Sequence, residues 1–171
     1  VLESPILTNS QLKRFIKFFS KKTKIIDCTF DISLSLKERI EAIREEAETA
    51  VREGSTCLIL SDKNISNQKA SIPSILTVGA IHSHLVKHGL RGYCSLNVEC
   101  SDALDTHSFA VLIGVGATTV NPYLAIDSIY QRFEKKLFGK NDFESCVVKF
   151  KKSIDAGLLK IMSKMGISVI S

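Results

Sequence analysis

The chain has 171 residues, of which 44% are hydrophobic, so it is long and apolar enough to fold around a core and is not a disordered tail. Its 23 basic and 18 acidic residues give a formal net charge of +5. A nucleic-acid groove would combine such charge with stacking aromatic residues, but the chain has no Trp and only three Tyr. The excess charge therefore indicates lysine-rich solvated faces rather than nucleic-acid binding.

Five cysteines are scattered along the chain without CxxC spacing, at Cys28, Cys57, Cys94, Cys100 and Cys146. An odd, scattered set argues against a disulfide framework and favours a reducing compartment, so we expect a cytoplasmic protein. No apolar run approaches the roughly 20 residues of a membrane span, so no membrane contact is expected. The chain starts at Val1 and stops within or just after an apolar run, which we interpret as a piece cut from a longer polypeptide.

Helical periodicity and short β-branched runs alternate along the chain. The first predicted helix covers residues 10–19. The clearest one covers 36–53, where a capping box of Ser35 and Glu38 is expected at its start and Gly54 at its end. In chain order, the other predicted helices cover residues 74–88, 106–113, 123–138 and 142–165. The predicted strands cover 24–29, 56–60, 95–98, 118–120 and 167–170.

Short, nearly all-apolar strands that alternate with helices are typical of parallel βα repeats. The run 57–60 (CLIL) is apolar on both sides, so both faces of that strand should be covered. No linker rich in Pro, Gly or Ser divides the chain. We therefore predict one α/β domain over 1–171, built either as an open sheet or as part of a barrel.

Polar side chains follow the predicted strands at Asp62, Glu99 and Asn121. In parallel α/β folds, sites are built at the carboxyl ends of the strands, so these residues are candidates for binding or catalysis. The structural alternatives are that Asp62 closes a turn, and that Asn121 caps the helix beginning near Pro122. The structural reading is favoured for both residues.

Three histidines, His82, His84 and His88, lie on the predicted helix 74–88. His84 and His88 are four residues apart and share one helix face, as pairs of metal ligands do. A third ligand, such as Glu99 or His107, would have to come from elsewhere in the fold. Without an H-E-x-x-H motif, surface histidines are the favoured interpretation, and no metal site is predicted.

Two further patterns, a pair of glycines and a cysteine–histidine pair, resemble functional motifs but do not indicate a site. Gly114 and Gly116 follow a helix and precede a strand, the reverse of the order in a dinucleotide-binding loop, so they are expected to end the helix. A nucleophilic pair of Cys94 or Cys100 with His107 has no distinguishing local signature. Read residue by residue, the chain offers no predicted catalytic, cofactor-binding or metal-binding residue.

Three blocks carry a resemblance to a known family: 109–117 (FAVLIGVGA), 121–125 (NPYLA) and 157–168 (GLLKIMSKMGIS). Together with 58–62 (LILSD) and 72–82 (IPSILTVGAIH), they resemble, in the same order, the central domain of the glutamate synthase large subunit. The sequence departs from the family pattern at three places: Lys63 stands where an arginine is usual, and residues 92–94 and 106–107 are atypical.

The resemblance implies a part of a larger enzyme, an oxidoreductase that makes glutamate from glutamine and 2-oxoglutarate. That family joins a glutamine amidotransferase to an FMN-dependent synthase with a 3Fe-4S cluster, and takes electrons from NADPH or ferredoxin. Its nucleophile and cofactor sites lie in other domains, so this segment is expected to be inactive alone, to bind no cofactor and to act as a structural linker.

The implied partners are the amidotransferase and synthase domains of the same polypeptide, with a small electron-transfer subunit as a further possibility. Two alternatives come from other functional classes. One is a free-standing α/β protein-interaction module, and the other is a small α/β enzyme that uses Asp62, Glu99 and Asn121 at its strand ends.

Overall fold

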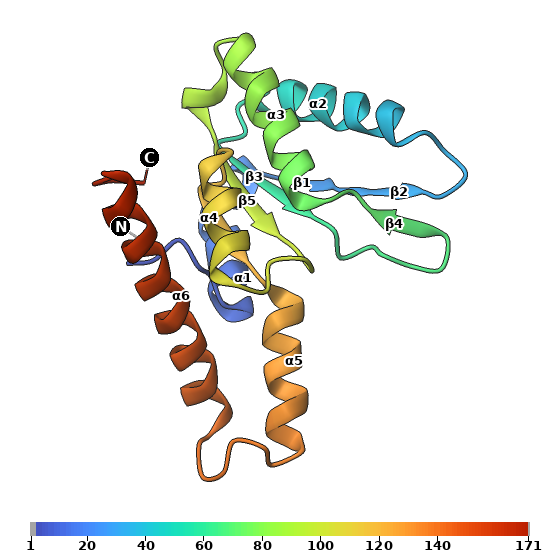
Figure 1. Cartoon of the computed structure of the whole chain (residues 1–171). Helices are drawn as coiled ribbons and strands as arrows, with labels where there is room; N and C mark the ends of the chain where they lie inside the picture. Colours follow the sequence, from blue (N-terminus) through green and yellow to red (C-terminus); the bar gives the residue numbers. More distant parts are fainter. Residues whose placement is uncertain (1–2, 171) are drawn as a thin grey trace.

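The computed structural model describes residues 3–170, and its centre is a four-stranded parallel sheet (Figure 1). The strands are β1 (Thr23–Asp27), β3 (Cys57–Ser61), β5 (Ser95–Glu99) and β6 (Thr119–Asn121), and they lie side by side in that order. Ile6 forms a parallel bridge with Val120 and so extends the sheet beyond β6. The predicted α/β class and its parallel strands are confirmed, and within residues 3–170 the sheet stays open.

The helices also follow the prediction closely. In chain order they are α1 (Asn9–Phe19), α2 (Leu36–Arg52), α3 (Ser74–Lys87), α4 (Thr106–Gly114), α5 (Tyr123–Glu134) and α6 (Phe143–Met165). Two short 3₁₀ turns precede β1 and β5, at Ser20–Lys22 and Arg91–Tyr93. Of the helices within residues 3–170, none is both long enough and apolar enough to cross a membrane.

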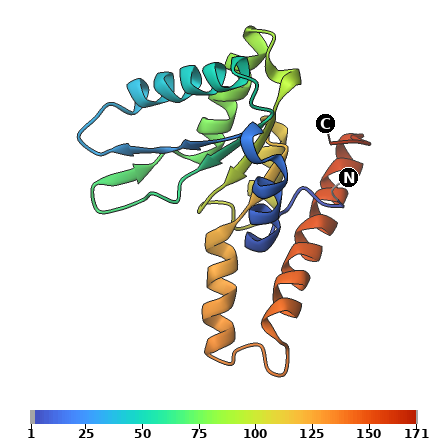
Figure 2. The same cartoon turned by 180° about the vertical axis from the view of Figure 1, so that it is seen from behind.

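Alternate residues of β3 show how the two faces of the sheet are covered. Leu58 and Leu60 belong to the main core, which includes Ile43 of α2, Ile81 of α3 and Phe109 of α4. Cys57 and Ile59 instead pack in a second cluster with Leu12 and other apolar residues of α1. Figure 2 shows α1 lying in front of the sheet, on the opposite side from α4. Because both faces are covered, all five β3 residues are buried, as the apolar run predicted.

A buried polar ladder crosses three strands on the face covered by α1. Asn97 of β5 is fully buried and donates to the Leu58 carbonyl oxygen of β3 at 3.1 Å and to Ser95 Oγ at 2.9 Å. Thr119 Oγ1 of β6 donates to Asn97 Oδ1 at 2.8 Å. These bonds satisfy side chains that would otherwise be costly to bury, and they fix β5 between its neighbours.

Two strands were not predicted and one predicted strand is absent. β2 (Thr29–Asp31) and β4 (Lys69–Ser71) form a separate antiparallel pair of three residues each, too short for a period-two pattern to stand out. The expected strand at 167–170 was wrong, because this segment has no strand pairing, and Val169 is 71% exposed. Its apolar composition resembles that of a strand, but it pairs with none of the strands among residues 3–170.

Helix capping differs in part from the prediction. Ser35 is the N-cap of α2, but its side chain makes no capping hydrogen bond, so the expected capping box with Glu38 was wrong. The capping box forms instead at α1, where Thr8 and Gln11 bond each other's backbone N–H groups. Gly116 follows the end of α4 with a φ of +115°, and a Cβ there would overlap the His82 ring. Glycine is therefore required at this turn.

The hairpin of α5 and α6 projects away from the sheet, as Figures 1 and 2 show from opposite sides. The amino-terminal half of α6 faces α5, while its later turns pack on α4 and bury Ile154 and Leu158 in the main core. Gly157 permits this approach, because a Cβ on it would overlap the side chain of Thr106. The Ser4 hydroxyl donates to Asp155 at 2.7 Å and holds the start of the described chain against α6.

Candidate functional site

The three strand-end candidates lie at one edge of the sheet. Ser61 pairs with Glu99, and Glu99 pairs with Asn121, in the register of neighbouring parallel strands. Asp62 follows β3 directly, and its backbone N–H donates to the Glu99 carbonyl oxygen at 3.2 Å. The prediction that Asp62, Glu99 and Asn121 share the carboxyl edge of the sheet is therefore confirmed.

Asp62 anchors the loop that follows β5. Its side chain is buried, and its Oδ2 accepts the backbone N–H of Ser101 at 2.9 Å and the Ser101 hydroxyl at 2.6 Å. Its Oδ1 lacks a hydrogen-bond partner in the described structure. Burial and the nearby Asp62 carboxylate raise the pKa of the Tyr123 hydroxyl above its ordinary value. Asp62 thus ties the end of β3 to the loop that follows β5.

Glu99 is held by two partners from the end of β3 and its loop. The Ser61 hydroxyl donates to Glu99 Oε2 at 2.6 Å, and Lys63 Nζ lies 2.7 Å from Glu99 Oε1. The Lys63 ammonium also lies 5.2 Å from the centre of the Tyr123 ring. Among the described residues, Lys63 makes one ion pair, with Glu99. Both oxygens of the Glu99 carboxylate are therefore engaged by side chains from the end of β3 and its loop.

Asn121 fastens the start of α1 to the sheet. Its Nδ2 donates to the Leu7 carbonyl oxygen at 2.8 Å and to Asn9 Oδ1 at 3.0 Å. The expectation that Asn121 caps α5 was wrong: Pro122 is the N-cap residue of that helix, and no side chain caps it. The local sequence is compatible with a cap, but Asn121 still belongs to β6 and its side chain turns toward α1.

The cavity beside Asp62 and Glu99 is too small for a substrate. The cavity bordered by Asp62, Glu99, Thr77 and Cys100 has a volume of about 10 Å³. That is about the space of one water molecule, whereas small-molecule sites are usually several hundred Å³. The strand-end residues are therefore brought together, but as a network of structural contacts.

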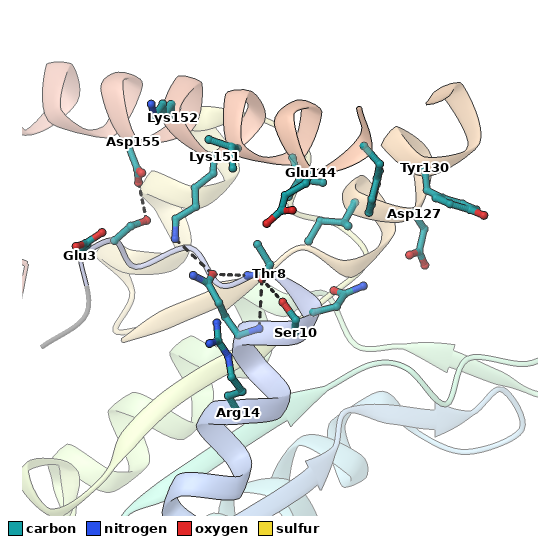
Figure 3. A pocket seen from close by; sticks show the side chains of 17 residues that line it. Glu3, Thr8, Ser10, Arg14, Asp127, Tyr130, Glu144, Lys151, Lys152 and Asp155 are labelled. Carbon is teal, nitrogen blue, oxygen red and sulfur yellow. Dashed lines mark hydrogen bonds between the residues drawn. The ribbon is translucent and has the colours of Figure 1, made fainter. Parts of the chain in front are cut away.

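A much larger cleft lies elsewhere, between the start of α1 and the α5–α6 hairpin (Figure 3). Its volume is about 820 Å³. Lys151 Nζ lies 3.4 Å from Gln11 Oε1 across it, and Arg14, Glu144 and Asp127 also line it. Its lining combines charged side chains of both signs with apolar ones such as Ile126 and Val147, so the lining does not indicate one class of ligand. Sequence reasoning missed it, because its walls come from segments more than 100 residues apart.

The histidines of α3 divide into two groups. The His82 Nδ1 accepts a hydrogen bond from Arg91 Nε at 3.1 Å, and burial together with the Arg91 charge lowers the pKa of His82. His84 and His88 instead face α2, and both contact the carboxylate of Glu48, a residue of that helix. The predicted third partners of this pair were Glu99 or His107, and Glu48 was not among them. Within residues 3–170, the group that forms is Glu48, His84 and His88.

The cysteines have the environment of small apolar side chains. Cys28, Cys57, Cys94 and Cys100 are buried and all five cysteines are free. Burial raises the pKa of the Cys28 thiol to about 12 and also raises that of Cys100. Raised pKa values disfavour the reactive thiolate. Within residues 3–170 no three cysteines gather at metal-ligand distances, so a 3Fe-4S cluster does not fit these residues.

Comparison with known proteins places these observations in a family. The family described as "Glutamate synthase central domain" matches residues 1–171. The chain belongs to this family. It is 49% identical to the glutamate synthase [NADPH] large chain of Azospirillum brasilense, a match that covers 99% of the chain and 11% of that protein. It is 39% identical to the ferredoxin-dependent glutamate synthase of Pyropia yezoensis, over 99% of the chain and 12% of that protein.

The central-domain chain thus spans about one ninth of the length of these relatives. Among solved structures, it is similar to a DHODH of Eimeria tenella in complex with ferulenol, with a TM-score of 0.55 and 15% identity. That match covers 86% of the chain and 35% of the DHODH chain. At this identity the likeness shows the fold alone.

Proposed function

We propose that this chain is the structural linker of a glutamate synthase large subunit, in which residues 1–171 form one α/β domain. It joins a glutamine amidotransferase to an FMN-dependent synthase that makes glutamate from glutamine and 2-oxoglutarate. The observation that carries this proposal is the family match over the whole chain, together with relatives about nine times longer.

The geometry of the strand ends supports a structural role. Asp62 holds Ser101, Glu99 is paired with Lys63, and Asn121 holds Leu7. The cavity that Asp62 and Glu99 border holds about 10 Å³, which speaks against the alternative of a small α/β enzyme that acts through them. We propose that the chain contributes no residue to the chemistry, and that FMN and the 3Fe-4S cluster are bound by other domains.

The electron donor, NADPH or ferredoxin, belongs to those other domains as well. The names of the two relatives differ in this respect, although the chain aligns with both over 99% of its length. The proposed partners are therefore the amidotransferase and synthase domains of the same polypeptide, with a small electron-transfer subunit in a donor-dependent form. We also propose a cytoplasmic location, which the free cysteines favour.

The length and content of the parent polypeptide test this proposal first. We expect a reading frame that extends far on both sides, with an amino-terminal cysteine nucleophile upstream and a flavin-binding segment with clustered cysteines downstream. Intact mass of the purified natural protein and the sequence of its reading frame measure this. A natural protein of about 171 residues would favour the free-standing interaction module and contradict the linker.

A further inference from the structure

The α2 and α3 helices bring two histidines and one glutamate together on a half-buried surface. His84 Nε2 lies 2.6 Å from Glu48 Oε2, and His88 Nδ1 lies 3.5 Å from Glu48 Oε1. One ligand atom of each residue lies within 4.8 Å of the others. His84 and His88 stand one helical turn apart, so their rings lie over each other with centroids 4.4 Å apart.

We propose that Glu48, His84 and His88 form a binding site for one zinc ion or a similar divalent metal. Imidazole nitrogens and a carboxylate oxygen are ligands that Zn²⁺ accepts, and three protein ligands with one water complete a tetrahedral shell. This inference departs from the expectation of no metal site, because the third ligand comes from a helix that the spacing of the histidines does not reveal. It does not depend on the proposed linker function.

The observed distances are close to those that a metal requires. Zn–N and Zn–O bonds of about 2.0–2.2 Å place tetrahedral ligand atoms about 3.4 Å apart. His88 Nδ1 lies 3.5 Å from Glu48 Oε1, so this imidazole nitrogen is beside the carboxylate whose Oε2 is the ligand oxygen. His84 Nε2 and Glu48 Oε2 must separate by roughly 0.8 Å as the metal replaces the proton shared between them.

The surroundings also fit a metal site. Arg52 binds Glu48 Oε1 at 2.8 Å, which orients the carboxylate and leaves Oε2 toward His84. Such a second partner on a ligand is a common feature of protein metal sites. The side chains of His84 and Glu48 are 14% and 20% exposed, and that of His88 is 35% exposed. The site is therefore sheltered on the side of the helices and open to solvent for metal entry and for a water ligand.

A metal at this position would join the second half of α2 to the end of α3. Each ligand comes from a helix that packs on the main core through other residues, among them Ile43, Ala47 and Leu85. Because the metal binds the folded arrangement and not the separated helices, it should stabilise the fold. The site is thus a structural metal site that joins two helices, and no catalytic role is assigned to it.

The test is zinc binding by the 171-residue chain, prepared without a polyhistidine tag, freed of metal and first shown by circular dichroism to have the helix content of the structure. Calorimetry should give one Zn²⁺ per chain, and Zn²⁺ should raise the unfolding temperature. His84→Asn, His88→Asn and Glu48→Gln should each weaken binding about tenfold or more, since even partners of ligands contribute ten- to hundredfold. The matched control His107→Asn removes an exposed histidine of α4 and should bind as the wild type does.

Cobalt as a probe separates this site from a thiolate site. The Co²⁺-loaded chain should show visible bands without thiolate charge-transfer absorption, and Cys146→Ser should leave them unchanged. If a ligand variant loses helical circular dichroism, its binding result is set aside. The exposed His88→Asn variant and the wild-type cobalt spectrum then decide whether these residues bind the metal. No zinc binding by the wild type, or binding by His84→Asn and His88→Asn that is as tight as that of the wild type, would overturn the proposal.

Discussion

Replacing Phe109 with alanine is expected to lower the free energy of unfolding by about 3–5 kcal/mol. Phe109 of α4 is fully buried in the main core and meets Phe150 of α6 edge to face, with ring centroids 6.4 Å apart. Removing its ring therefore loses apolar burial and leaves a cavity where α4 and α6 meet. Urea unfolding of the chain, followed by circular dichroism, measures the change.

Phe18→Ala is the matched control, because the Phe18 side chain is 83% exposed. We expect this variant to stay within about 0.5 kcal/mol of the wild type, as most surface substitutions do. Equal effects of the two substitutions would mean that α4 and α6 do not share a packed core.

Replacing Asn97 with leucine should destabilise the chain by about 1–3 kcal/mol although the side chain stays buried. The Thr119 hydroxyl loses its acceptor, and the Leu58 carbonyl oxygen loses a donor. Thr119→Val alone should cost a similar amount, because it leaves Asn97 Oδ1 without its donor.

The double variant Asn97→Leu with Thr119→Val removes both partners at once. Its cost should fall below the sum of the single costs by about 0.5–3 kcal/mol, the range for residues in one hydrogen-bond network. Strict additivity in urea unfolding would show that the buried ladder across β3, β5 and β6 does not act as a unit.

The sequence predicts the parts of the fold that local patterns determine. The all-apolar run 57–60 indicated a strand covered on both faces, and the helical periodicity of 36–53 indicated α2. Gly166 directly follows the predicted helix 142–165 and ends α6 in the left-handed conformation, which glycine adopts readily. Each of these signals depends on neighbours within one or two turns of the chain.

The features that sequence reasoning missed depend on contacts between distant segments. The strand expected at 167–170 has the right composition but no partner strand within residues 3–170. Ser35 and Glu38 have capping-box spacing, yet the side-chain bond forms at Thr8 instead. The neighbour of His84 is Glu48, 36 residues earlier, and no spacing rule in one sequence identifies such a pair.

At the strand ends, the sequence predicted where the polar residues lie but not which partners they contact. The order of the elements placed Asp62, Glu99 and Asn121 at one edge, because carboxyl ends of parallel strands meet there. What each side chain does there is decided by partners such as Ser101 and Leu7, which the strand pattern does not specify. Topology was therefore predictable, and the roles of the individual residues were not.

The linker proposal is tested most directly by glutamate formed per glutamine hydrolysed in the full-length enzyme carrying Asp62→Ala. Asp62 holds Ser101 at the end of β5, so its loss should shift the edge of the sheet without removing a catalytic group. A misplacement of about 1 Å can lower a rate on the order of a hundredfold, so the effect can be large without a chemical role. Asp31→Ala, which alters an exposed turn with Ser33, is the control.

With the fold intact by circular dichroism, Asp62→Ala should keep glutamine hydrolysis and flavin reduction when each is measured alone. Glutamate formed per glutamine should fall severalfold while ammonia-dependent formation persists, and the Asp31→Ala control should match the wild type. A complete loss of either half-reaction in a folded Asp62→Ala enzyme would contradict the account, because this residue would then take part in the chemistry.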